Sequence, residues 1–259
     1  MSRKVFPDLG YCMYCGKTQS LSSEHIVPYA LGGEVELKAS SCGECAAITS
    51  KFERTLLRGQ FWRARLALEL KSRRKHRDAP THTQIKISVE GQESELEIER
   101  DSSPAVISFP IYSVPRLVIG QTADGVAVAG NVAINFGADP VAIAEAHNAS
   151  ELKFTDSTNP YQFAQLLAKI AYGMAVATGA TEHLIEPSPL PDVILGKNTR
   201  AGDYVGSMTD ELTAYPEHLH RVAIFVDEKT GYLVADIQLF SSSQSPRYAV
   251  VIGKTRSTT

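Results

Sequence analysis

Residues 11–58 decide the fold of the N-terminal part of the chain, and they read YCMYCGKTQSLSSEHIVPYALGGEVELKASSCGECAAITSKFERTLLR. All four cysteines of the protein lie here, in two Cys-x-x-Cys pairs, Cys12/Cys15 and Cys42/Cys45. Each such turn presents two sulfurs to one metal ion, so the spacing predicts a tetrahedral structural zinc. The alternatives are two disulfides or four buried thiols. The lack of a signal peptide and of a spare cysteine favours zinc.

Glu24 and His25 lie between the two cysteine pairs, shortly before Pro28. A histidine that is neutral near pH 7 can take a proton from water, and a carboxylate is a hard oxygen ligand for Mg²⁺ or Mn²⁺. Phosphodiester hydrolysis needs both a base and a cation. Because neighbours on a regular strand point to opposite faces, the two side chains share a site only where the strand ends or bulges. A histidine of this kind standing alone would more often be a solvated loop residue.

The order Cys-x-x-Cys, Glu-His-Ile-x-Pro, Leu-Gly-Gly, Cys-x-x-Cys and then a helix resembles the zinc-containing HNH endonucleases. The resemblance covers about the first 60 residues. It implies a β-hairpin packed on one helix around a catalytic divalent metal, Mg²⁺ or Mn²⁺, with DNA as the substrate. It also implies that His25 is the general base and that Glu24 is a ligand of the catalytic metal. The structural zinc would be held by Cys12, Cys15, Cys42 and Cys45.

Two features depart from the family's pattern. The segment 34–41 contains no Asn, and Ala46 follows the last cysteine where many members carry a metal-binding Asn or His. A subset of the family instead has a Glu eight residues after that cysteine, which is Glu53 here. On a regular helix Ala46 and Glu53 lie on nearly the same face, because seven residues turn through about 700°. We therefore predict Glu53 as the second carboxylate of the catalytic metal site.

The charge of the chain is unevenly distributed. The net charge is −3, yet residues 51–77 hold ten Lys/Arg against two Glu, while the remainder holds 16 basic and 27 acidic residues. A concentrated basic segment beside a candidate nuclease site is expected to bind phosphates, although a solvated helix face and a basic linker would have the same composition. The predicted nucleic-acid contacts are Arg54, Arg58, Arg63, Lys71, Arg73 and Arg74.

The rest of the chain predicts a larger β-rich domain with one long helix, so that the fold class is α+β. A length of 259 residues suits two domains, and the charged segment 72–82 predicts a boundary that divides the chain into 1–79 and 80–259. Asn159-Pro160 and the apolar residues after it predict a helix that ends at Gly179. Residues 185–207 are expected to form a loop. Alternating apolar residues predict a hairpin over 85–98 and strands at 105–109, 116–119, 126–129, 132–136, 221–226, 232–240 and 248–252.

These observations leave three functions open. The first is an HNH-type DNA endonuclease, favoured by the Glu24-His25 pair. The second is a catalytically degenerate zinc module that binds nucleic acid without cleaving it, favoured by Ala46. The third is a zinc-stapled interaction domain, which the basic segment disfavours. No apolar stretch is long enough to span a bilayer and the first ten residues lack a signal-peptide core, so we expect a cytoplasmic protein without a membrane partner.

Overall fold

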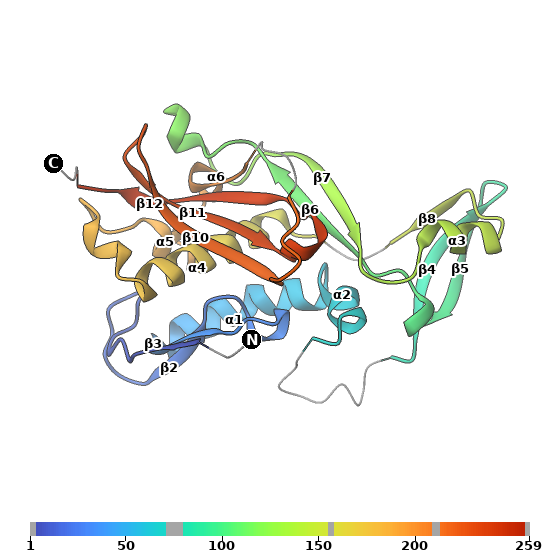
Figure 1. The fold of residues 1–259 in the computed structure, drawn as a ribbon, viewed down its shortest axis with the longest axis horizontal. Coiled ribbons are helices and arrows are strands. Elements are labelled where there is room, and N and C mark those ends of the chain that lie inside the picture. The colour runs from blue at the N-terminus through green and yellow to red at the C-terminus, as the bar shows by residue number, and fades with distance from the viewer. Residues whose placement is uncertain (1–3, 71–79, 155–157, 209–212, 257–259) are drawn as a thin grey trace.

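Helix α4 (Pro160–Ala177) lies at the centre of the molecule (Figure 1). Its N-terminus is capped by the Asn159 side chain, which accepts a hydrogen bond from the Gln162 N–H at 2.9 Å. The helix ends before Gly179, whose φ of +74° lies in the left-handed region. This is the long helix that the sequence predicts. The structure is a computed structural model, and it describes residues 4–70, 80–154, 158–208 and 213–256.

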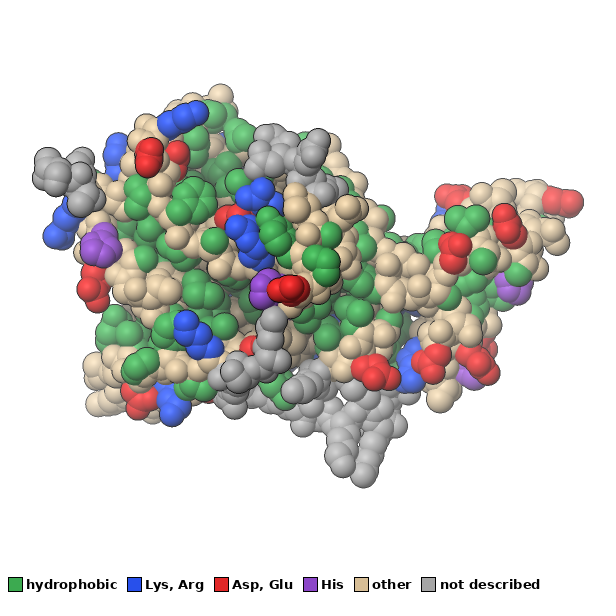
Figure 2. Space-filling model, viewed as in Figure 1, with side chains coloured by type: hydrophobic (Ala, Val, Ile, Leu, Met, Phe, Trp, Pro, Cys, Tyr) green, Lys and Arg blue, Asp and Glu red, His purple; other side chains and the backbone are tan. Residues whose placement is uncertain are grey.

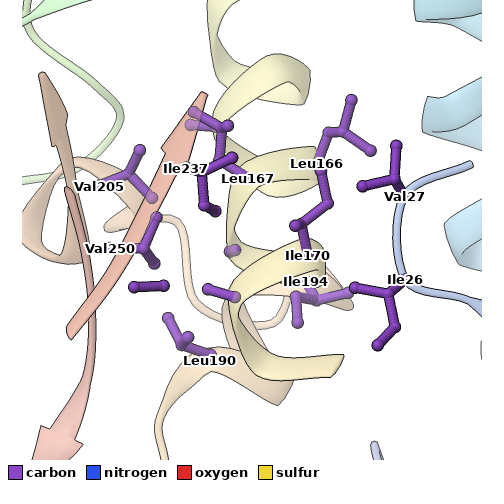
Figure 3. Close-up of a cluster of buried hydrophobic side chains, with 14 of the residues drawn as sticks. Ile26, Val27, Leu166, Leu167, Ile170, Leu190, Ile194, Val205, Ile237 and Val250 are labelled. Carbon is purple, nitrogen blue, oxygen red and sulfur yellow. The ribbon is translucent and has the colours of Figure 1, made fainter. Parts of the chain in front are cut away.

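The two sides of α4 are buried against different parts of the chain. Figure 3 shows Leu166 and Ile170 on the side of Ile26, which belongs to the N-terminal part. Leu167 points to the other side, toward Ile237 of the C-terminal sheet. Full burial of each such side chain is worth about 1.5–3 kcal/mol. The packing on both sides therefore fixes α4 between the two parts.

A β-hairpin and a helix form the N-terminal part, as the sequence predicts. β3 pairs antiparallel with β2 and parallel with β1, and it leads directly into α1. The turn after β2 passes through Gly33, where a Cβ atom would lie 1.9 Å from the Val27 carbonyl oxygen, so only glycine fits. A short helix, α2, follows Gly59. The elements are β1 (Lys4–Phe6), β2 (Leu21–His25), η1 (Tyr29–Leu31), β3 (Val35–Cys42), α1 (Gly43–Arg58) and α2 (Trp62–Ala67).

A four-stranded antiparallel sheet covers the opposite side of α4, in the order β10-β11-β12-β9 (Figure 1). The long ribbon β6–β7 packs beside it. The three predicted C-terminal strands are confirmed as β10, β11 and β12. The elements of this part are β6 (Val106–Tyr112), η4 (Arg116–Ile119), β7 (Val128–Asn135), η5 (Ala180–His183), α5 (Leu190–Ile194), α6 (Ala201–Tyr204), β9 (Val205–Ser207), β10 (His220–Asp227), β11 (Tyr232–Leu239), η6 (Ser241–Ser243) and β12 (Arg247–Lys254).

A small arm projects from this body at the far end of β6 and β7 (Figure 1). Its sheet has the order β5-β4-β8, and the hairpin β4–β5 confirms the prediction for residues 85–98. Asp and Glu side chains are frequent on the arm in Figure 2. The elements are β4 (His82–Val89), β5 (Gln92–Glu99), η3 (Arg100–Ser102), α3 (Pro140–Ala146) and β8 (Glu151–Lys153).

Three sequence predictions for the C-terminal part are wrong. Residues 116–119 form a 3-10 helix rather than a strand, because Gly120 closes a turn at φ +68°. The two strands predicted over 126–129 and 132–136 are one strand, β7. Residues 185–207 are not a loop but include α5, α6 and β9, whose apolar side chains are buried against α4.

Helices and sheets are mixed throughout the described chain, in agreement with an α+β class. The division into 1–79 and 80–259 stays a prediction, and the hydrophobic core of the described residues includes side chains from both sides of it. Within the same residues, no helix combines the length and the apolar character needed to cross a membrane.

Candidate functional site

The four cysteines come together as the sequence predicts. Their Sγ atoms all lie within 4.8 Å of one another, and those of Cys15 and Cys42 are 3.6 Å apart. Zinc–sulfur bonds of about 2.3 Å in a tetrahedron place sulfurs about 3.8 Å apart, so this donor set fits zinc. Cys15 is exposed and the other three are buried, and all four are free thiols rather than disulfides. The cluster can therefore hold a structural zinc.

Local backbone structure aims these sulfurs at one point. After Cys12 the chain turns tightly, with the Gly16 N–H donating to the Cys12 carbonyl at 2.8 Å and Gly16 at φ +77°. Cys42 is the N-cap of α1, and Cys45 lies in its first turn. A hydrogen bond from the Cys45 backbone lowers the pKa of the Cys42 thiol to about 7. This end of α1 thus favours the thiolate form that a metal requires.

A second centre lies in an open pocket of about 550 Å³, lined by residues of β2, of η1 and of α1. Glu24 and His25 both line it, although they are neighbours on a strand. The pairing of β2 with β3 shifts register between Ser22 and Glu24, and β2 ends at His25. This irregularity is what the sequence requires for the two side chains to share a site.

Helix α1 presents three parallel stripes, each with the helical spacing of 4, 3 and 4 residues. The first stripe is buried and contains Cys45, Thr49, Phe52 and Leu56. The second, one residue further on, lines the pocket with Ala46, Ser50, Glu53 and Leu57. Ala46 and Glu53 thus lie on one face, as predicted. The third stripe is exposed and contains Ala47, Lys51, Arg54 and Arg58.

Lys169 of α4 completes the pocket, and the sequence analysis did not identify it. Its Nζ lies 2.7 Å from Glu24 Oε1 and 2.6 Å from Glu53 Oε1, and it donates to the His25 carbonyl oxygen at 2.7 Å. The Lys169 side chain is only 1% exposed. Burial disfavours the charged ammonium, but the two carboxylates outweigh burial, so the pKa of Lys169 is raised. One sequence signal could have found it, since Lys169 is the sole charged residue of α4.

The structure revises the predicted nucleic-acid contacts. Arg54 and Arg58 are exposed beside the pocket stripe. Arg63 is a correction, because it is buried and its guanidinium donates to the Gln84 carbonyl at 2.8 Å, away from solvent. Lys71, Arg73 and Arg74 lie outside the described residues.

Comparison with known proteins assigns the N-terminal segment. The family model of the HNH endonucleases matches residues 12–58. This segment is similar to the HNH endonucleases. The matched HNH segment contains the four cysteines, Glu24, His25 and Glu53, and it ends before Lys169. No curated protein and no solved structure matches the chain.

A divalent ion that bridges Glu24 and Glu53 does not fit the donors around the pocket. One oxygen of each carboxylate is already bound to the Lys169 ammonium, and Ala46 stands where a further ligand is common in the family. Across the described ranges, the cysteine cluster is the single group of three or more potential metal ligands that lie close enough to bind one ion. The predicted Mg²⁺ or Mn²⁺ could bind Glu24 and Glu53 only if Lys169 moved away from them, and this cofactor stays a prediction.

Proposed function

We propose that this protein is an HNH-type endonuclease that hydrolyses phosphodiester bonds in DNA. The observation that carries the proposal is the pocket that joins His25, Glu24 and Glu53 within the matched HNH segment. A similarity to endonucleases suggests nuclease activity on nucleic acid, and the arrangement of the pocket supplies a base beside two carboxylates. The cytoplasmic location stays a prediction.

His25 is the proposed general base. It lies at the end of β2 and lines the pocket, and its ring stands next to the Tyr29 ring, with centroids 5.3 Å apart. A neutral imidazole there can take a proton from the water that attacks a phosphodiester. The Glu24 and Glu53 carboxylates border the same space and can orient that water as hydrogen-bond acceptors.

The exposed stripe of α1 is the proposed approach for the nucleic-acid backbone. Lys51, Arg54 and Arg58 are one residue, or about 100° of helix rotation, away from the stripe that lines the pocket. Their positive charges can hold phosphates close to His25 without reading sequence. DNA rather than RNA is the expected substrate because of the resemblance to the HNH endonucleases.

Plasmid cleavage by the wild type and by His25→Ala tests the proposal. We expect the wild type to nick or linearise supercoiled DNA and His25→Ala to lose about 10²–10⁴-fold in rate, the usual effect of removing a general base. His147→Ala is the matched control, because His147 is exposed on the arm. Reactions with Mg²⁺, with Mn²⁺ and without either ion test the predicted cofactor. Equal rates for the wild type and His25→Ala would overturn the assignment of the base.

A second function is favoured by Ala46 and by the engagement of both carboxylates with Lys169. These features are also expected of a zinc module that binds nucleic acid but has lost cleavage. If the wild type shifts DNA in a gel at low salt but does not cut it in the presence of any divalent ion, the binding module replaces the endonuclease.

A further inference from the structure

We propose that Lys169 is the resident cation of the pocket, and that its ammonium takes the position between Glu24 and Glu53 that a bridging divalent ion would otherwise take. The inference rests on the proposed function only in assigning this pocket as the active site. It adds a positioning residue from outside the HNH segment. It also predicts how the two carboxylates respond to metal ions.

The contacts of the ammonium support this role. Lys169 Nζ donates a hydrogen bond to the His25 carbonyl oxygen at 2.7 Å. It also forms ion pairs with Glu24 Oε1 at 2.7 Å and Glu53 Oε1 at 2.6 Å. These three oxygens come from β2 and α1, the two elements that carry the candidate catalytic groups. Lys169 therefore fixes the carboxylates relative to the strand end that bears His25.

Burial and charge make the ammonium hard to replace. Lys169 is 1% exposed, while the side chains of Glu24 and Glu53 are 10% and 18% exposed. A hydrated divalent ion could enter the bridging position only if the ammonium gave up three short contacts and moved. With Lys169 present the three side chains carry a net charge of −1, and without it the pair carries −2. A vacated position should therefore attract a divalent ion much more strongly.

The packing of α4 holds the lysine in register. The Tyr172 hydroxyl donates to the Met13 carbonyl oxygen at 3.0 Å, which ties α4 to the first cysteine turn. Next to it, α4 packs on the HNH segment, since a Cβ atom at Gly173 would lie in ordinary contact, 3.6 Å from an Ile26 side-chain carbon. The ammonium therefore reaches the carboxylates from a fixed helix rather than from a loop.

Manganese binding to the zinc-loaded full chain, followed by electron paramagnetic resonance, tests the proposal. We expect the wild type to bind no Mn²⁺ through Glu24 and Glu53. Lys169→Ala should gain one Mn²⁺ site, at least about tenfold tighter than any site in the wild type. Lys169→Ala/Glu53→Gln should lose that site again. Lys197→Ala is the matched control, because Lys197 is exposed and its contact to Asp192 is long, at 3.8 Å.

Two results would overturn the proposal. One is Mn²⁺ binding to the wild type that Glu53→Gln abolishes, and this comparison requires no lysine variant to fold. The other is a Lys169→Ala protein that keeps its zinc content and circular dichroism but gains no Mn²⁺ site. If Lys169→Ala does not fold, the comparison of the wild type with Glu53→Gln decides alone. These experiments measure Mn²⁺ binding and not DNA cleavage. Their result therefore tests the role of Lys169 even if the protein proves not to be a nuclease.

Discussion

Two centres are built on β2, β3 and α1, and they differ in the source of their positive charge. The cysteine cluster brings four thiols together, and a metal ion bound there would supply the positive charge. The pocket brings two carboxylates together, and their cation is Lys169, which lies 144 residues after His25 in the sequence. The first centre is completed within the HNH segment, and the second is completed by the rest of the protein.

The difference separates two sources of stability. If it holds zinc, the cysteine cluster stabilises the hairpin and α1 through the bound metal, because the thiols alone give little attraction. The pocket is stabilised by tertiary packing, because α4 must be in place for Lys169 to reach Glu24 and Glu53. Chelators should therefore affect the first centre, whereas substitutions in α4 should affect the second.

The largest expected effect is on the cysteine cluster. Cys42→Ser removes one of four ligands, and a structural zinc supplies about 10 kcal/mol or more of folding free energy in small zinc domains. We expect the variant to lose most of its zinc, against about one ion per wild-type chain, and to unfold in the N-terminal part. Metal analysis and hydrogen exchange resolved by segment would measure both.

A chelator gives the control for this prediction. Treating the wild type with a strong chelator should reproduce the exchange pattern of Cys42→Ser, and added Zn²⁺ should reverse it in the wild type alone. Undiminished protection of β2, β3 and α1 in the variant would mean that the four thiols are not a structural metal site.

A smaller effect is expected at Lys169, where breaking the charge cluster should reduce global stability. Lys169→Met keeps the length and apolar stem but leaves two largely buried carboxylates without their cation, which costs about 3–5 kcal/mol for a buried pair. Lys169→Met/Glu53→Gln should recover part of this loss, because one of the two repelling charges is gone. Urea unfolding of the zinc-loaded proteins measures both changes.

Lys197→Met is the control for the charge itself. Lys197 and Asp192 are both exposed, and such pairs contribute about 0–1 kcal/mol. If Lys169→Met were as stable as Lys197→Met, the carboxylates would not depend on the lysine, and the contrast between the two centres would be lost.

The same contrast explains how much could be predicted from the sequence. The cysteine spacing and the turns of α1 are local, so the cluster and the shared face of Ala46 and Glu53 were predictable. Lys169 could have been noticed as the one charge in the apolar helix α4, but its contacts to Glu24 and Glu53 were not predictable, because they depend on long-range packing. Arg63 was assigned to the surface from charge alone. The packing of α2 against the rest of the fold places it in the interior, where it donates to the Gln84 carbonyl.

The smallest expected effect concerns the exposed stripe beside the pocket. Arg54→Gln/Arg58→Gln removes two charges that contact solvent, so folding and zinc content should not change. If each arginine meets one DNA phosphate, the slope of log affinity against log salt should fall in magnitude by about 1.8, since each contact contributes about 0.9. Fluorescence anisotropy with a labelled duplex over a range of salt concentrations measures the slope.

Arg200→Gln/Arg256→Gln is the matched control, because it removes the same charge from exposed positions outside the HNH segment. Net charge alone would lower affinity similarly in both double variants, whereas direct phosphate contacts change the slope only for the α1 pair. Equal slopes in the two variants would mean that the stripe is a solvated helix face. DNA would then have to approach His25 over another surface, and the exposed stripe of α1 would not distinguish the pocket from the cysteine cluster.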